Sequence, residues 1–185
     1  MNVPNTLSLV RILFIPVFIL VYYLPYSWSH IAATAVFAIA GITDWFDGYL
    51  ARKLGQSSNL GAILDPLADK LMVVVALVLL VADNPSNNWL LFSTLIIISR
   101  EILISTLREW MAVQGESKKV AVSYTGKVKT VLQIIAISLL IYKHDFLYMP
   151  TYLFGLILLV IAAFITLMSM LNYIYAARDT IRDAD

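Results

Sequence analysis

Six long apolar segments, separated by short polar connections, account for most of this chain. Each is close to the roughly 20 apolar residues that an α-helix needs to cross the hydrocarbon core of a bilayer. Transmembrane β-strands are shorter and alternate between apolar and polar residues, so the pattern predicts helices. The predicted membrane spans are residues 7–24, 31–50, 62–82, 89–111, 127–142 and 152–176, after a short juxtamembrane segment at the N-terminus.

The composition is that of an integral membrane protein. Hydrophobic residues make up 61% of the chain and charged residues 14%, and the mean hydropathy is +0.83. A soluble domain is about half apolar and about a quarter charged. Residues 1–185 are therefore predicted to form a single all-α membrane domain. Because the N-terminus lacks a basic stretch and a small-residue cleavage site, we expect the first apolar segment to be retained as a helix.

Residue types and net charge exclude several classes of function. The chain contains no cysteine, which excludes disulfides, thiolate metal sites and cysteine nucleophiles. The formal net charge of +1 gives no indication of a nucleic-acid partner. The distribution of charge along the chain is more informative than its sum.

Lysine and arginine are unevenly distributed among the connections between the predicted spans. Arg52 and Lys53 lie between the second and third spans, and Lys118 and Lys119 lie between the fourth and fifth. The other three connections carry Lys143 alone. The positive-inside rule then places both basic connections and both termini in the cytoplasm, which is consistent with an even number of spans.

Four aspartates lie inside or beside apolar segments at helical spacing. Asp44 and Asp47 are three residues apart, and Asp65 and Asp69 are four apart, so each pair shares one face of a helix. The first pair lies near the predicted cytoplasmic end of the second span, and the second pair near the cytoplasmic start of the third. Because the connection is short, these helices are expected to be antiparallel neighbours whose carboxylates converge at one depth.

Convergent carboxylates at the edge of a membrane indicate a divalent cation. A charged side chain in hydrocarbon costs roughly 3 kcal/mol or more unless it is compensated. An isolated aspartate near the end of a span is usually solvated or caps the helix, but that alternative does not account for four together. Oxygen ligands favour Mg²⁺, Mn²⁺ or Ca²⁺. Four carboxylates are enough for a two-metal site, which suits displacement at phosphorus.

The aspartates belong to a longer pattern that resembles a known family. Two glycines, which permit close approach of a helix or a ligand, accompany the aspartates. The pattern resembles the signature of the CDP-alcohol phosphotransferases and departs from it at no position. It reads Asp44-x-x-Asp47-Gly48-x-x-Ala51-Arg52, eight residues, then Gly61-x-x-x-Asp65-x-x-x-Asp69.

The resemblance implies a membrane enzyme with six spans that displaces CMP from a CDP-linked lipid with an alcohol. It implies a bacterial cytoplasmic (inner) membrane enzyme that acts as a homodimer, with its active site facing the cytoplasm. The expected cofactors are two Mg²⁺ or Mn²⁺ ions. The implied metal ligands are Asp44, Asp47, Asp65 and Asp69, and Asp69 is also the implied general base.

The resemblance also implies the residues that bind the CDP-diacylglycerol substrate. Gly48, Ala51 and Gly61 would leave room for the cytidine, and Arg52 would contact the nucleotide. The N-terminal segment adds three candidates whose alternative role is helix capping or snorkelling to the membrane surface. These candidates are Asn5, Ser8 and Arg11.

Two further segments, 99–110 and 120–130, resemble the branch of the family that uses sn-glycerol 3-phosphate as the acceptor. A phosphorylated acceptor needs charge-assisted hydrogen-bond donors. The candidates for binding it are Arg100 and Arg108 in the fourth span and Lys127 and Lys129 at the start of the fifth. The alternative for Arg100 is an ion pair with its neighbour Glu101 or with an adjacent helix.

Three other functions are alternatives to phosphatidyl transfer to glycerol 3-phosphate. Within the family, the acceptor could be another alcohol, such as inositol phosphate or serine. Outside it, intramembrane carboxylates also line the pathways of cation carriers and channels. Conduction needs polar groups across the membrane, whereas these aspartates gather at one end. A purely structural scaffold leaves four convergent aspartates uncompensated.

Overall fold

The computed structural model describes residues 3–54, 59–116, 124–144 and 150–182. Side chains are described throughout these ranges except at residues 3–9, 11, 44–54, 59–66, 69, 124–127, 179 and 181–182. Structural statements below refer to these described residues.

Six α-helices make up the described chain, and they match the six predicted spans, although the first helix ends two residues before its predicted end. The main differences are at the ends: the first helix begins before the predicted span, so Asn5 and Ser8 belong to it rather than to a separate segment. The sixth helix continues six residues past the predicted end. The helices are α1 (Val3–Tyr22), α2 (Ser29–Leu54), α3 (Asn59–Asp83), α4 (Asn88–Val113), α5 (Tyr124–Tyr142) and α6 (Thr151–Arg182).

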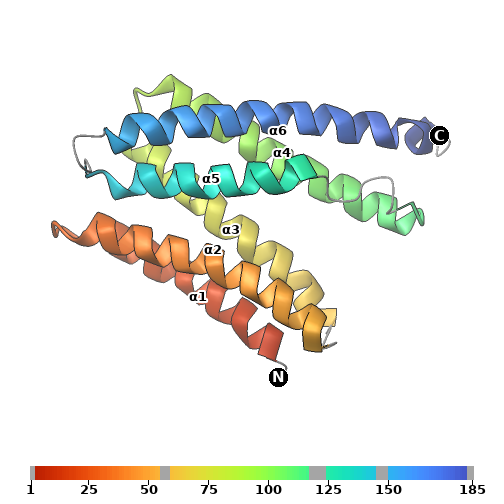
Figure 1. Cartoon of the computed structure of the whole chain (residues 1–185), viewed down its shortest axis with the longest axis horizontal. Coiled ribbons are helices and arrows are strands. Elements are labelled where there is room, and N and C mark those ends of the chain that lie inside the picture. The colour runs from red at the N-terminus through yellow and green to blue at the C-terminus, as the bar shows by residue number, and fades with distance from the viewer. Residues whose placement is uncertain (1–2, 55–58, 117–123, 145–149, 183–185) are drawn as a thin grey trace.

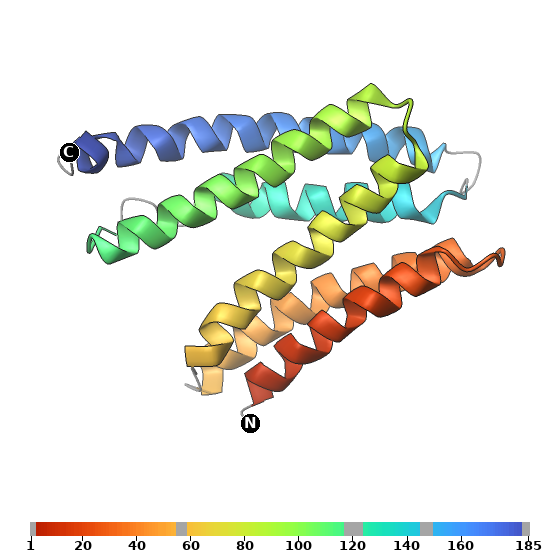
Figure 2. The same cartoon turned by 180° about the vertical axis from the view of Figure 1, so that it is seen from behind.

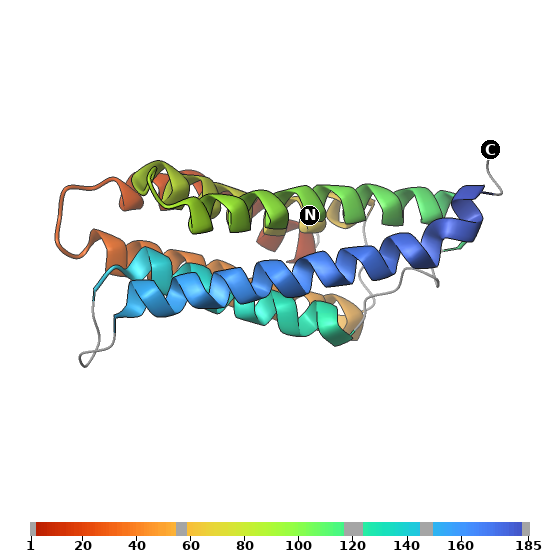
Figure 3. The same ribbon diagram turned by 90° about the horizontal axis from the view of Figure 1, so that it is seen from above.

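The six helices run up and down along the length of the molecule (Figure 1). The connections α1–α2, α3–α4 and α5–α6 lie together at one end, on the left of Figure 1 and of Figure 3. We call this the opposite end. At the other end, α2 finishes, α3 begins, α4 finishes and α5 begins. We call it the signature end, because residues 44–52 and 61–69 belong to the parts of α2 and α3 nearest to it.

The helices are close together at the opposite end and diverge toward the signature end. Figure 2 shows α1, α2 and the start of α3 slanting away from α4 and α6. Contacts along the way join α2 to α5 and α3 to both α4 and α5. Helices α2 and α3 therefore bring the aspartate-containing segments to one side of the molecule, and α4 and α5 bring the basic residues to the other.

The exterior of the bundle is apolar, as expected for contact with lipid. Large apolar side chains on several helices are more than half exposed, among them Leu13 (64%), Leu20 (69%), Ile102 (63%) and Phe164 (64%). A soluble monomer rarely exposes so much contiguous apolar surface. Within the described residues, Asn88–Val113 and Thr151–Arg178 are long and apolar enough to cross a membrane.

The interior of the opposite half is packed without buried charge. Its core includes Phe18, Phe37, Leu77, Leu140 and Leu159, each no more than 2% exposed. The Phe18 and Phe37 rings lie 6.1 Å apart, centroid to centroid, and join α1 to α2. This half holds the helices together by side-chain packing.

Polar contacts close the opposite end. The Tyr22 hydroxyl donates a hydrogen bond of 3.0 Å to the Asp83 carboxylate, and the Lys143 ammonium forms an ion pair with the same carboxylate. The start of α4 is fixed by Asn87, whose side-chain oxygen accepts a 3.1 Å hydrogen bond from the Leu90 amide. Its amide nitrogen donates to the Tyr152 hydroxyl at 3.0 Å. These contacts tie α1, α3, α4 and α6 together where the chain reverses.

Gly155 allows the close approach of α5 and α6, and its replacement tests this packing. A methyl group at Gly155 would lie 3.0 Å from Leu139 Cβ and 3.1 Å from the Ala136 carbonyl oxygen. Because neither atom is the end of a flexible side chain, we expect Gly155→Ala to destabilise the protein by about 1–3 kcal/mol. The measurement is the thermal unfolding midpoint of the protein in detergent.

Gly41→Ala is the matched control for this prediction. A methyl group at Gly41 would meet Ile134 at 3.6 Å, an ordinary contact, and alanine has the higher helix propensity. Gly41→Ala should leave the midpoint unchanged or raise it. An unchanged midpoint for Gly155→Ala would show that close α5–α6 packing at this position contributes nothing to stability.

Candidate functional site

The aspartates of the signature lie on two helices whose ends adjoin. Asp44 and Asp47 belong to the second half of α2, and Asp65 and Asp69 to the first half of α3. Figures 1 and 2 both show the end of α2 beside the start of α3. The antiparallel arrangement predicted from the sequence is confirmed. The four side chains lie outside the described residues, so their convergence stays a prediction.

The remaining signature residues and the N-terminal candidates lie on the same side of the molecule. Their backbones belong to the last turns of α2, the first turn of α3 and the first half of α1. Their side chains also lie outside the described residues, so the roles expected of them stay predictions. These residues are Asn5, Ser8, Arg11, Gly48, Ala51, Arg52 and Gly61.

The donor chemistry at the signature end fits a hard divalent cation. The side chains that the structure describes contain no group of three or more acidic or histidine residues that could hold a metal. The aspartates of α2 and α3 offer carboxylate oxygen without sulfur or imidazole, the donor set that Mg²⁺ and Mn²⁺ prefer. That these aspartates bind a metal stays a prediction.

Glu101 is the centre of a buried charge cluster between α3, α4, α5 and α6. Its Oε1 atom accepts from Arg100 Nη1 at 3.3 Å and forms an ion pair with the Lys129 ammonium. Arg100 and Lys129 are only 7% and 2% exposed. Arg100 Nη2 also reaches Ser169 Oγ on α6 at 3.4 Å. Arg100 thus forms the ion pair with Glu101 and the contact with an adjacent helix that were its alternative role.

Tyr173 on α6 positions the two arginines of α4. The Arg108 guanidinium donates a 2.7 Å hydrogen bond from Nη2 to the Tyr173 hydroxyl and lies 5.0 Å above the ring centroid. The Arg100 guanidinium lies 5.7 Å from the same centroid. The aromatic face attracts both cations, and the hydroxyl orients one of them.

Positive charge exceeds negative charge in the described part of this cluster. Four cations, Arg100, Arg108, Lys129 and Lys70, lie on α3, α4 and α5 around Glu101, the carboxylate that the structure describes there. The Nε atoms of Arg100 and Arg108 have no hydrogen-bond partner among the described residues. Since buried charge needs compensation, the cluster is suited to an anion.

Sequence reasoning overlooked Lys70 and Tyr173. The Lys70 ammonium donates to the Ser105 hydroxyl, which in turn donates to the Glu101 carbonyl oxygen. The position of Lys70, next to Asp69 inside an apolar segment, could have indicated a functional residue, because buried charges are costly there. Tyr173 had none, because a tyrosine near the end of a span is typical of a membrane interface.

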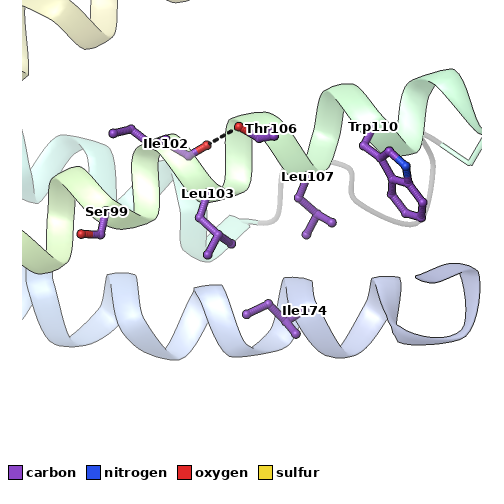
Figure 4. A pocket seen from close by; sticks show the side chains of 7 residues that line it. All are labelled: Ser99, Ile102, Leu103, Thr106, Leu107, Trp110 and Ile174. Atoms are coloured by element: carbon purple, nitrogen blue, oxygen red, sulfur yellow. Dashed lines mark hydrogen bonds between the residues drawn. The ribbon is translucent and has the colours of Figure 1, made fainter. Parts of the chain in front are cut away.

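A separate groove lies on the outside of the bundle between α4 and α6. It has a volume of about 820 Å³, and Figure 4 shows its lining side chains. Its hydroxyl groups come from Ser99 and Thr106, and the Thr106 hydroxyl donates to the Ile102 carbonyl oxygen at 3.1 Å. Leu103, Leu107, Trp110 and Ile174 make the remaining surface largely apolar. The groove suits hydrocarbon rather than a nucleotide or a sugar phosphate.

The fold and the signature define a class of membrane enzyme. The chain matches the CDP-alcohol phosphatidyltransferase family over residues 1–174 and belongs to that family. It is similar to the CDP-diacylglycerol–glycerol-3-phosphate 3-phosphatidyltransferases of Escherichia coli (strain K12) and Shigella flexneri serotype 5b (strain 8401). It is 46% identical to each over 182 residues, which cover 98% of this chain and 98% of each relative.

Replacing Glu101 tests whether this carboxylate holds the cluster together. Glu101→Gln removes the charge that pairs with Arg100 and Lys129 and leaves two buried cations without compensation. We expect a loss of about 3–5 kcal/mol of stability, because breaking a buried ion pair costs that much. The measurement is the unfolding midpoint in detergent, at low salt and without added phosphate.

Glu109→Gln is the control for this prediction, because Glu109 is an exposed acid on the same helix. The control should change the free energy of unfolding by no more than roughly 0.5 kcal/mol, as is typical of surface substitutions, so its midpoint should stay close to that of the unmodified protein. If both variants unfold at the same temperature, Glu101 does not stabilise the cluster.

Proposed function

We propose that this protein transfers a phosphatidyl group from CDP-diacylglycerol to sn-glycerol 3-phosphate and forms phosphatidylglycerophosphate and CMP. The observation that carries the proposal is the 46% identity, over nearly the whole of both chains, to relatives whose names state this reaction. The surplus of buried positive charge beside the aspartate helices supports an acceptor that carries phosphate. The reaction supplies a precursor of anionic phospholipids such as phosphatidylglycerol and cardiolipin.

In this proposal, the aspartates of α2 and α3 hold the metal and activate the acceptor. Asp44, Asp47, Asp65 and Asp69 hold two Mg²⁺ or Mn²⁺ ions, which neutralise the diphosphate and the charge on the departing CMP when they are bound. Asp69 takes the proton from the 1-hydroxyl of glycerol 3-phosphate as the general base. The hydroxyl oxygen attacks the β-phosphorus, and the bond from that phosphorus to the CMP oxygen breaks.

The same helices would bind the nucleotide of CDP-diacylglycerol. Gly48 and Ala51 on α2 and Gly61 on α3 leave space for the cytidine because their side chains are small or absent. Arg52 contacts the nucleotide. Asn5, Ser8 and Arg11 on α1 add contacts from the next helix, since α1 packs against both α2 and α3.

The cations of α4 and α5 would bind the phosphate of the acceptor. Arg108, held by Tyr173, and Lys129, held by Glu101, approach from two helices, and Lys127 lies two residues before Lys129. Arg100, also almost completely buried, adds positive potential. Charge-assisted hydrogen bonds of this kind are roughly twice as strong as neutral ones.

The proposal includes the orientation of the protein in the bacterial cytoplasmic membrane. All six helices would span it, with the first turns of α1 along its surface. Both termini and the signature end would face the cytoplasm, where Arg52, Lys53, Lys118 and Lys119 satisfy the positive-inside rule. A homodimer is proposed on family resemblance.

The packed core counts against a cation pathway. In the half of the bundle toward the opposite end, α2 and α3 present Phe37, Met72, Leu77 and Leu80 to the interior, each no more than 3% exposed. Conduction needs hydrophilic groups or water across the whole membrane. The described residues there offer packed apolar side chains instead.

The direct test measures CMP release by the purified protein with CDP-diacylglycerol, Mg²⁺ and a series of acceptors. We expect release with glycerol 3-phosphate and little with inositol phosphate, serine or no acceptor, and a loss of release when the metal is chelated. Comparable release with serine or inositol phosphate would contradict the proposed acceptor. Cation flux through protein-containing liposomes without lipid synthesis would support transport instead.

Asp69→Asn tests the general base. Loss of a positioned base lowers turnover by about 10²–10⁴-fold. CMP release should fall by that factor at saturating glycerol 3-phosphate, while Asp185→Asn in the C-terminal tail should act like the unmodified protein. Near-normal turnover of Asp69→Asn with Mg²⁺ or Mn²⁺ would overturn the assignment.

Lys127→Ala tests the acceptor-phosphate site. The variant should raise the KM for glycerol 3-phosphate about tenfold, the order of one charge-assisted hydrogen bond, and change the KM for CDP-diacylglycerol much less. Lys118→Ala, in the neighbouring connection, is the matched control for loss of one positive charge. Equal effects of Lys127→Ala on both substrates would argue against this role.

A further inference from the structure

A small cavity lies inside the bundle between α3, α4 and α5. Its volume is about 60 Å³, enough to hold water or a small polar group. The residues that line it are Lys70, Val73, Glu101, Thr130, Gln133 and Ile134.

Gln133 is the unusual member of this lining. Its side chain is buried, at 5% exposure, and lines the cavity beside Glu101. A buried amide needs hydrogen-bond partners, so one that lines a cavity normally meets a ligand or an ordered water. An amide can both donate and accept, which makes it a suitable partner for a hydroxyl group.

Glu101 supplies a second hydrogen-bond acceptor at the cavity. Both ion pairs of this carboxylate, with Arg100 and with Lys129, use Oε1. Oε2 takes part in neither of these ion pairs. The cavity therefore combines one amide and one carboxylate oxygen that are available to a neutral polar group.

The cavity lies one helical turn beyond two residues of the proposed reaction. On α3, Val73 follows Asp69 by four residues, and on α5, Gln133 follows Lys129 by four residues. Residues four apart share a helix face and differ in height by about 6 Å. Both helices run from the signature end toward the opposite end (Figure 1), and the cavity extends in that direction from Lys70 and Thr130, the neighbours of Asp69 and Lys129.

We propose that this cavity is the subsite for the secondary hydroxyl of the acceptor, with Gln133 as the residue that recognises it. The inference rests on the proposed function. When the acceptor phosphate lies at the cations and its 1-hydroxyl at Asp69, the 2-hydroxyl is the one polar group left without a partner. The Gln133 amide and Glu101 Oε2 supply that partner.

This subsite makes the 2-hydroxyl a determinant of acceptor choice. An acceptor that lacks it leaves the Gln133 amide unpaired in a buried position, and sites built to bind a hydroxyl reject such analogues strongly. The matched pair of acceptors is sn-glycerol 3-phosphate and 3-hydroxypropyl phosphate, which differ only in the 2-hydroxyl.

The experiment measures kcat/KM for both acceptors with the unmodified protein, Gln133→Met and the exposed control Gln114→Met. We expect the unmodified protein and Gln114→Met to prefer glycerol 3-phosphate by about tenfold or more. In Gln133→Met the preference should fall to about twofold or less, through a lower kcat/KM for glycerol 3-phosphate. The value for 3-hydroxypropyl phosphate should be unchanged.

Two results would overturn the subsite. One is an equal kcat/KM for both acceptors with the unmodified protein. The other is a loss of the same factor for both acceptors in Gln133→Met, which is the result expected of a purely structural residue. If Gln133→Met does not fold, the same ratio of kcat/KM values is measured for Gln133→Asn. Its shorter side chain should weaken the preference for glycerol 3-phosphate. CMP release from the unmodified protein with neither acceptor would overturn the proposed function itself.

Discussion

Buried charges inside this apolar bundle must be compensated, and the rest of the structure depends on the ion pairs of Glu101 that do so. One carboxylate oxygen holds Arg100 of its own helix and Lys129 of α5. Without it, two cations that are almost completely buried would face each other in a medium of low dielectric constant. The carboxylate thus allows α4 and α5 to carry cations at this depth, and it sets the position of the Lys129 ammonium.

The two ends of the bundle divide stability and chemistry between them. At the opposite end, Tyr22, Asp83 and Lys143 connect α1, α3 and the end of α5, above a core of tightly packed apolar side chains. Because that half is fixed by packing, the helices can diverge toward the signature end and bring different chemical groups to its two sides. The aspartates come from α2 and α3, and the cations come from α4 and α5 together with Lys70 of α3.

This separation matches the two halves of the proposed transfer. A diphosphate lipid needs metal, which carboxylate oxygens hold, and a phosphorylated acceptor needs cations, which arginine and lysine supply. Tyr173 and Glu101 hold the cations in place, and the cavity lined by Gln133 adjoins them at Glu101.

The sequence alone determined the membrane class, the six helices and the pairing of α2 with α3. The reason is physical: hydrocarbon forces each apolar segment to satisfy its own backbone hydrogen bonds, and a short connection forces its helices to be antiparallel neighbours. The spacing of Asp44, Asp47, Asp65 and Asp69 likewise indicated two helix faces and a metal before any packing was known.

Only the tertiary structure decided which groups meet across helices. Three features depend on how the helices are rotated and how close they approach: the pairing of Glu101 with Lys129, the place of Tyr173 beneath the two arginines, and the cavity lined by Gln133. Spacing along one helix fixes which residues share a face. It does not fix which face of the neighbouring helix they will meet, because that is set by the packing of the whole bundle.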